Sequence, residues 1–235
     1  MAQFNGFDPT IREFLHTLKE NNSREWYNNC KERYKVLVYK PFSLLTEDLT
    51  RVIYEIDKDI LTKPSKCISR IYRDSRFSKD KTLYRENVWI TFSRAIYEDI
   101  ELPSYYFEIN PTGYSYGMGY YMPKPYVMSA FRKHITAEPK KFLNALKVIE
   151  KNGKLYIEGD LYKKPKLGEV PCELAKWGYY KNFYVTSNNI EDFNHCYSSK
   201  LVLELEKCFK ALAPLYDFII KTPIEKINYN NDILL

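Results

Sequence analysis

Tyr105 to Tyr121 reads YYFEINPTGYSYGMGYY, two alternating segments joined by a turn sequence. Aromatic and other apolar residues recur at every second position on each side of Asn110-Pro111-Thr112-Gly113. Alternation with period two is typical of a strand with one buried face, and turn-forming residues between two such runs favour a hairpin. The spacing therefore predicts antiparallel strands over Ser104–Asn110 and Tyr114–Tyr121.

The same alternation continues on both sides of this hairpin, and segments of helical period lie beyond it. Further strands are expected over these ranges: Cys67–Arg73, Asn87–Arg94, Lys154–Ile157 and Lys181–Thr186. Helices are expected to run from Asp8 to Asn21, Asn22 to Val38, Phe42 to Ile56, Met128 to Ile135, Phe142 to Ile149 and Ser199 to Ile219. Strands in the middle of a chain with helices before and after predict an α+β fold. We expect a single domain over residues 1–235, with its core at about 7–220. Its central sheet should be mostly antiparallel, with about four to six strands and the helices mainly on one face.

Alternation also assigns the two faces of this sheet. One set is almost entirely apolar or aromatic and should pack under the helices. It comprises Ile71, Val88, Ile90, Phe92, Tyr105, Phe107, Ile109, Tyr114, Tyr116 and Met118. The other set mixes charge, hydroxyl groups, rings and glycine. It comprises Arg70, Tyr72, Asp74, Trp89, Thr91, Ser93, Tyr106, Glu108, Ser115, Gly117, Gly119 and Tyr121.

Gly117 and Gly119 fall on the second face, two residues apart. Glycine weakens a strand because it has no side chain to pack and more backbone entropy to lose. A β-bulge or the tight crossing of a helix would account for both glycines. Alternatively, they form the floor of a ligand pocket bordered by Arg70, Glu108 and the neighbouring rings.

The net charge of +6 lies in one segment, Thr62 to Arg85. Its eight basic residues are Lys63, Lys66, Arg70, Arg73, Arg76, Lys79, Lys81 and Arg85. Asp74 and Asp80 are its acidic residues, and the rest of the chain carries 28 basic and 28 acidic residues. This distribution indicates one electropositive locus instead of a generally cationic surface.

Three interpretations of the basic segment remain open. The first is a structural salt-bridge network. The second is an anionic small molecule bound through phosphate or carboxylate groups, since arginine presents a fork of donors to such groups. The residues predicted to hold that molecule are Arg70, Arg73, Arg76, Ser78, Lys81, Tyr84, Gly117 and Gly119. Asp74 would orient an arginine, and Glu108 would bind a hydroxyl or amine. The third is nucleic-acid binding. A compact cluster of charge is weaker support for it than an extended basic stripe would be.

An enzyme acting on a phosphorylated substrate at the same site is the alternative to a binding protein, with Asp74 or Glu108 as the general base. The sequence contains no glycine-rich nucleotide loop and no standard nucleophile or metal motif, so we expect no cofactor and no metal. No apolar run approaches the roughly 20 residues of a membrane-spanning helix, and Met1–Phe14 lacks the features of a secretory signal. The five cysteines show no CxxC pairing and are expected to be reduced thiols in a cytoplasmic protein.

Three motifs occur in this order along the chain: NNSREW (Asn21–Trp26), SRIYRDSRFSKDKTLYRENV (Ser69–Val88) and YYFEINPTGYSYGMGYYMP (Tyr105–Pro123). Together they closely resemble domain-of-unknown-function family 2461. The resemblance extends from about Phe7 to Phe218 and is weakest after Lys151. Family members often have proline where Leu83 stands, so this turn is expected to be less rigid here. The resemblance implies no assigned activity, but a pattern so rich in Arg, Asp, Lys and Glu favours a ligand site over packing alone.

Overall fold

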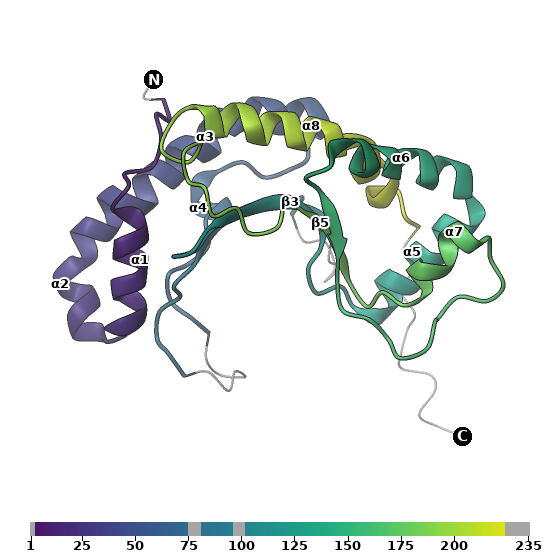
Figure 1. Ribbon diagram of the computed structural model, residues 1–235, viewed down its shortest axis with the longest axis horizontal. Helices are drawn as coiled ribbons and strands as arrows, with labels where there is room; N and C mark the ends of the chain where they lie inside the picture. The colour runs from purple at the N-terminus through teal and green to yellow at the C-terminus, as the bar shows by residue number, and fades with distance from the viewer. Residues whose placement is uncertain (1–2, 75–80, 96–101, 224–235) are drawn as a thin grey trace. The chain divides into compact units, whose positions relative to one another are not determined.

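The computed structural model describes residues 3–74, 81–95 and 102–223, apart from the side chains of residues 150–152. The helices are α1 (Ile11–Glu20), α2 (Arg24–Tyr34), the π-helix η1 (Lys35–Tyr39), α3 (Lys40–Ile56), α4 (Pro64–Cys67), α5 (Pro125–Ala137), α6 (Pro139–Asn152), α7 (Cys172–Ala175), the 3₁₀-helix η2 (Lys176–Gly178) and α8 (Lys200–Ile220). The strands are β1 (Val88–Phe92), β2 (Ser104–Ile109), β3 (Tyr114–Tyr120), β4 (Tyr156–Glu158) and β5 (Phe183–Thr186). Within the described residues these strands form one antiparallel sheet in the order β1-β2-β3-β5-β4. The predicted α+β fold is confirmed (Figure 1).

The chain divides into two compact units. The first unit comprises Met1–Ala95, Ser104–Gly117 and Thr186–Ala211, and the second comprises Ile96–Pro103, Met118–Val185 and Leu212–Leu235. Three elements, β3, β5 and α8, contribute residues to both units. The single domain expected from the sequence stays a prediction.

In the first unit, the buried face of the sheet is the one that alternation assigned. The nine residues of the predicted inner set that belong to this unit are at most 5% exposed, and Met118, in the second unit, is fully buried. The Phe42 ring of α3 lies 5.9 Å from the Phe107 ring of β2, and the Phe209 ring of α8 lies 5.0 Å from Tyr105. Helices therefore cover this face within the unit, and α1 and α2 lie side by side as a pair (Figure 1).

In the second unit, aromatic rings from helices and strands meet in a buried cluster. The Trp177 ring lies 4.8 Å from Phe142 of α6 and 5.1 Å from Phe183 of β5. Phe131 of α5 lies 4.9 Å from the same Phe183 ring. Because these rings are each 0% exposed, they form the core that orders β5 and its neighbours.

The segment expected to form a strand over Cys67–Arg73 is not a continuous strand. Cys67 ends the short helix α4, and the residues after it pair only through isolated bridges, Ile68 with Ile90 and Tyr72 with Tyr84. Four residue steps from Ile68 to Tyr72 therefore face six steps from Tyr84 to Ile90. Two extra residues on one side of a ladder make a bulge, which interrupts regular pairing.

The space beside Gly119 is filled by strand β5. A Cβ atom at this position would collide with the Phe183 carbonyl oxygen and with Cα and Cβ of Tyr184. Close approach of the neighbouring strand thus requires glycine at Gly119, and no open pocket floor is present at this residue. Gly117 is buried in the same strand.

Candidate functional site

A cleft of about 830 Å³ lies in the first unit, beside the half-buried face of β2. Its described lining comes from three places in the sequence: helix α1, the segments flanking the basic stretch, and the end of β2 with the following loop. The lining residues are His16, Lys19, Glu20, Arg73, Arg85, Glu86, Asn87, Glu108, Asn110, Pro111 and Thr112. A volume of this size suits a small organic ligand.

Helix α1 is attached to the cleft by Arg12. Its Nε donates a hydrogen bond to the Pro111 carbonyl oxygen at 3.2 Å, and its guanidinium lies 4.5 Å from the centre of the Phe193 ring. His16, Lys19 and Glu20 follow Arg12 at helical spacing, so the same exposed helix face reaches the cleft. The β2–β3 loop is held by Asn110, whose Oδ1 accepts bonds from the backbone N–H groups of Thr112 and Gly113.

Asn22 holds the basic segment against the start of α2. Its Oδ1 accepts hydrogen bonds from the N–H groups of Leu83 (2.7 Å) and Tyr84 (2.9 Å), and its Nδ2 donates to the Tyr84 carbonyl oxygen (2.9 Å). The bulge follows directly and carries Glu86 and Asn87, both of which line the cleft. A polar side chain at the beginning of one helix therefore positions part of the cleft wall.

Arg85 and Glu108 line the cleft, and Trp89 lies beside both of them. Trp89 and Glu108 are directly paired across β1 and β2, and the Arg85 guanidinium lies 4.9 Å from the centre of the Trp89 ring. Asn87 Nδ2 donates to Glu108 Oε1 at 3.1 Å. Burial raises the pKa of Glu108, whereas the bond from Asn87 and the attraction of Arg85 act in the opposite direction. The carboxyl group is thus held in a partly desolvated position next to a cation.

The charges of the described lining residues are mixed. Lys19, Arg73 and Arg85 are basic, whereas Glu20, Glu86 and Glu108 are acidic. Lys19 is paired with Glu86 at 2.7 Å. The Arg85 guanidinium forms no hydrogen bond or ion pair with another residue of the described chain, although its charge attracts the Glu108 carboxylate.

The structure brings two of the predicted site residues, Arg73 and Glu108, to the cleft. Arg70, Asp74 and Lys81 are exposed and are not among the lining residues. Tyr84 is 1% exposed and stacks on Tyr27 with ring centres 4.5 Å apart; burial raises its pKa to about 12. Neither Gly117 nor Gly119 is among the described residues of the lining. Arg76 and Ser78 lie outside the described residues.

The lining residues that sequence reasoning missed carried two signals. Arg85, Glu86 and Asn87 end the YREN sequence of the second motif, immediately before β1. His16, Lys19 and Glu20 repeat on the polar face of a helix whose opposite face is buried. The second signal marks an exposed face only, because periodicity does not say what that face lies beside.

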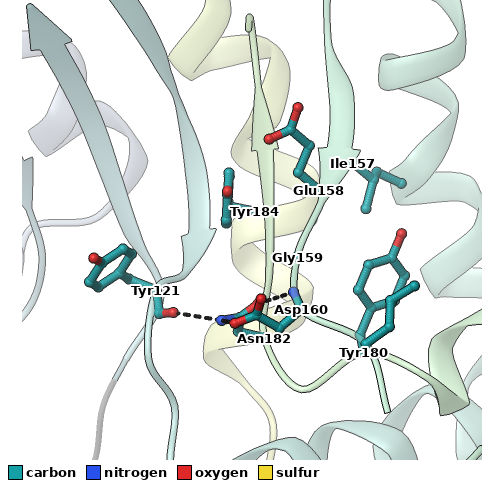
Figure 2. A pocket seen from close by; sticks show the side chains of 9 residues that line it. Tyr121, Ile157, Glu158, Gly159, Asp160, Tyr180, Asn182 and Tyr184 are labelled. Atoms are coloured by element: carbon teal, nitrogen blue, oxygen red, sulfur yellow. Dashed lines mark hydrogen bonds between the residues drawn. The ribbon is translucent and has the colours of Figure 1, made fainter. Parts of the chain in front are cut away.

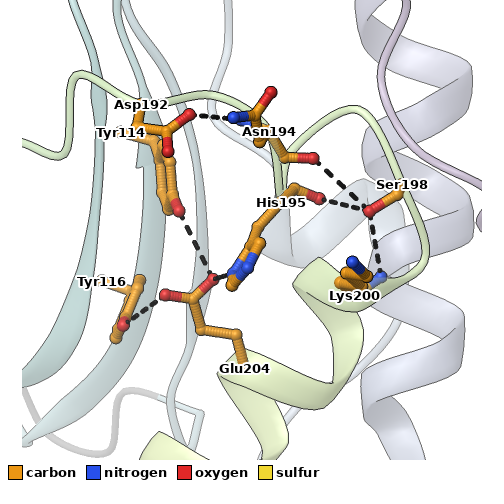
Figure 3. A network of polar contacts seen from close by, with 8 residues as sticks. All are labelled: Tyr114, Tyr116, Asp192, Asn194, His195, Ser198, Lys200 and Glu204. Atoms are coloured by element: carbon orange, nitrogen blue, oxygen red, sulfur yellow. Dashed lines mark hydrogen bonds and ion pairs between the residues drawn. The ribbon is translucent and has the colours of Figure 1, made fainter.

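A second polar network in the first unit centres on Glu204 of α8 (Figure 3). Its Oε1 accepts a hydrogen bond from the Tyr116 hydroxyl at 2.8 Å, and its Oε2 accepts one from the Tyr114 hydroxyl at 3.3 Å. His195 Nδ1 lies 2.7 Å from the same Oε2. Burial, followed by interactions with Glu204, raises the pKa of both tyrosines. This carboxylate satisfies two buried hydroxyl groups and so fastens α8 to β3.

A family model described as "Conserved hypothetical protein (DUF2461)" matches residues 10–218 of the chain. The chain belongs to the DUF2461 family. The predicted family is therefore confirmed. No match to a curated protein was found. In this member of DUF2461, the first two motifs meet at Asn22, and the second and third meet where Arg85 and Asn87 approach Glu108.

Among the helices that the structure describes, none combines the length and apolar character that crossing a bilayer requires.

Proposed function

We propose that the cleft binds a small molecule carrying a phosphate or carboxylate group, with Arg85 as the main anchor. The observation that supports this most directly is the Arg85 guanidinium, which lines the cleft, lies 4.9 Å from the centre of the Trp89 ring and forms no ion pair within the described chain. Stacking fixes the plane of a guanidinium, and a fixed fork of N–H donors matches an anionic group with two oxygens.

Glu108 would bind a different part of the same ligand. Because burial raises the pKa of Glu108, its carboxyl group keeps its proton to a higher pH than an exposed glutamate does. Protonated, it can donate a hydrogen bond to an oxygen; ionised, it can accept one from a hydroxyl or amine. The mixed charge of the cleft therefore favours a ligand with an anionic group at one end and a hydroxyl or amine at the other.

A thermal-shift screen tests this proposal with phosphorylated metabolites, carboxylated metabolites and short oligonucleotides. A ligand present at about 100 times its Kd stabilises a protein by roughly 2.7 kcal/mol, or roughly 5–10 °C for a chain of this size. We expect one class of small anionic metabolite to give such a shift, and Arg85→Ala to abolish it. Arg73→Ala should weaken it, because Arg73 lines the same cleft.

Arg70→Ala is the matched control, since Arg70 is an exposed arginine of the same segment and is not among the lining residues. It should leave the shift unchanged. The proposal is contradicted if Arg70→Ala and Arg85→Ala reduce the shift equally. A response to oligonucleotides alone, with a steep loss of affinity in salt, would replace it with nucleic-acid binding.

A second candidate is an enzyme that acts on a phosphorylated substrate in the same cleft. The observation that favours it is the raised pKa of Glu108 in a cleft beside an arginine, an arrangement typical of general acid–base groups. Once a ligand is found, Glu108→Gln distinguishes the two candidates. An enzyme should keep its affinity and lose turnover about 100-fold or more, whereas a binding protein should show no turnover in either form.

A further inference from the structure

A second hollow, of about 520 Å³, lies in the second unit where β3, β4 and β5 end or begin. Tyr121 follows β3, Glu158 ends β4, and Asn182 and Tyr184 lie at the start of β5. In the view of Figure 2, the Tyr121 and Tyr180 rings lie on opposite sides of the contact between Asn182 and Asp160. We call this hollow the tyrosine groove.

The charges of the tyrosine groove are all negative. Glu158 and Asp160 are its ionisable acids, and its described lining contains no lysine, arginine or histidine. Neither carboxylate forms an ion pair within the described part of the chain: Asp160 is bonded by the Asn182 amide, and Glu158 by the Tyr184 hydroxyl. Lys181, adjacent to Asn182, lies with its Nζ 5.5 Å from the Tyr162 ring centre instead. On a chain with a net charge of +6, this is a local site of the opposite sign.

Aromatic rings surround these carboxylates. The Tyr121 side chain is 78% exposed, so its ring is accessible from solvent. Burial and the adjacent Glu158 carboxylate raise the pKa of Tyr184, so its phenol stays neutral and its ring is available as an uncharged surface. Carboxylates together with tyrosine rings attract organic cations, because the ring faces and the carboxylate oxygens are both negative.

The groove is held in shape by Asn182. Its Oδ1 accepts the Asp160 N–H at 2.7 Å, while its Nδ2 donates to Asp160 Oδ2 and to the Tyr121 carbonyl oxygen, each at 3.1 Å. A side chain added at Gly159 would collide with Asn182, so the turn after β4 lies tightly against β5. One amide thus fixes the ends of three strands and the spacing of the groove's acidic and aromatic groups.

We propose that the tyrosine groove binds an alkylammonium group, either on a free polyamine or on a lysine side chain of another protein. The ammonium lies between the Glu158 and Asp160 carboxylates, and its methylene chain lies against the Tyr121 and Tyr184 rings. This site is separate from the Arg85 cleft and does not depend on what that cleft binds.

Isothermal titration calorimetry on the full chain tests the site with two probes at low salt: spermidine, and a short lysine-containing peptide of otherwise neutral residues. We expect saturable binding of at least one probe. The combined variant Glu158→Gln/Asp160→Asn should lower the affinity about tenfold or more. Tyr121→Ala should lower it about threefold or more through loss of the ring.

The matched control is Glu169→Gln/Glu173→Gln, which removes two exposed carboxylates of the same unit outside the groove. It should leave the affinity unchanged, as should Arg85→Ala. Binding of spermidine alone would identify a polyamine site, and binding of the peptide alone a site for a partner's lysine; either result supports the proposal. It is overturned if neither probe binds saturably, or if the control pair lowers the affinity as much as the groove pair.

Discussion

The pKa of Glu108 is set by influences that act in opposite directions. Burial favours its protonated form, whereas the Asn87 amide and the Arg85 guanidinium favour its ionised form. Burial prevails, so the folded chain holds the Glu108 proton more tightly than the unfolded chain does. Ionised Glu108 therefore costs stability.

This raised pKa predicts how Glu108→Gln changes stability with pH. Glutamine keeps the acceptor for Asn87 and cannot ionise. The free energy of unfolding of the wild type should fall as pH rises from the ordinary value of 4.5 through the higher folded-state pKa, and the variant should lack this fall. Urea unfolding at pH 4 and pH 7 measures the effect: relative to wild type, the variant should gain stability at pH 7.

Glu13→Gln, at an exposed position of α1, supplies the baseline for the loss of one glutamate. The interpretation of Glu108 is wrong if the difference between Glu108→Gln and wild type is the same at both pH values.

At the scale of elements, Asn22 connects the start of α2 to the segment that enters β1. Three hydrogen bonds from one side chain satisfy three backbone groups of Leu83 and Tyr84. Buried backbone groups without hydrogen-bond partners cost free energy, so these three bonds stabilise the segment that precedes the cleft-lining residues in sequence.

Asn22→Ala should lower the free energy of unfolding by about 2 kcal/mol or more, because these backbone groups lose their partners. Asn22→Asp should lose less, since its oxygen can still accept the two N–H bonds. Chemical denaturation measures both variants, with Asn28→Ala, an exposed position of α2, as the control. A loss in Asn28→Ala as large as that in Asn22→Ala would contradict this role.

The faces of the sheet could be predicted because alternation is a local pattern: residues two positions apart in a strand lie on the same face. All ten residues of the predicted inner set are buried. The sequence could not show that Cys67–Arg73 fails to form a continuous strand. The bulge that interrupts it lies in the opposite segment, Tyr84–Ile90, and exists only through the pairing of the two segments. On α2, Tyr27 is buried against Tyr84, whereas Trp26 and Cys30 are half-buried.

The candidate site was predictable only in part for the same reason. Basic charge marked the segment, and Arg73 and Glu108 do line the cleft. However, composition does not show which arginine lies over an aromatic ring. Arg85 can be recognised as a candidate anchor only from the structure, which places it beside Trp89. For Gly119 the sequence suggested a β-bulge, a helix crossing or a pocket floor; that β5 fills the space depends on a strand more than 60 residues away in sequence.

At the scale of the whole molecule, the division into two units does not follow the chain. The sequence passes between them repeatedly, and β3, β5 and α8 belong to both. Unfolding of either unit would remove strands and part of a helix that the other unit uses. We therefore expect the units to unfold together.

Differential scanning calorimetry checks this expectation. A single transition, with a calorimetric enthalpy equal to the van't Hoff enthalpy, is expected for the full chain. Two resolved transitions, or a calorimetric enthalpy well above the van't Hoff value, would show that the units unfold separately and would contradict the single domain predicted from the sequence.

The bulge at Glu86 and Asn87 has a consequence for how this family can vary in length. The surplus between the bridges is two residues, an even number, so alternation is preserved on both sides of the bulge. Insertion or deletion of one residue between Tyr84 and Val88 would turn Trp89 into the core or move Arg85 away from it. Relatives that keep Arg85 beside Trp89 should therefore differ in length here by an even number of residues. An odd difference in length would mark members that have lost this arrangement of the cleft.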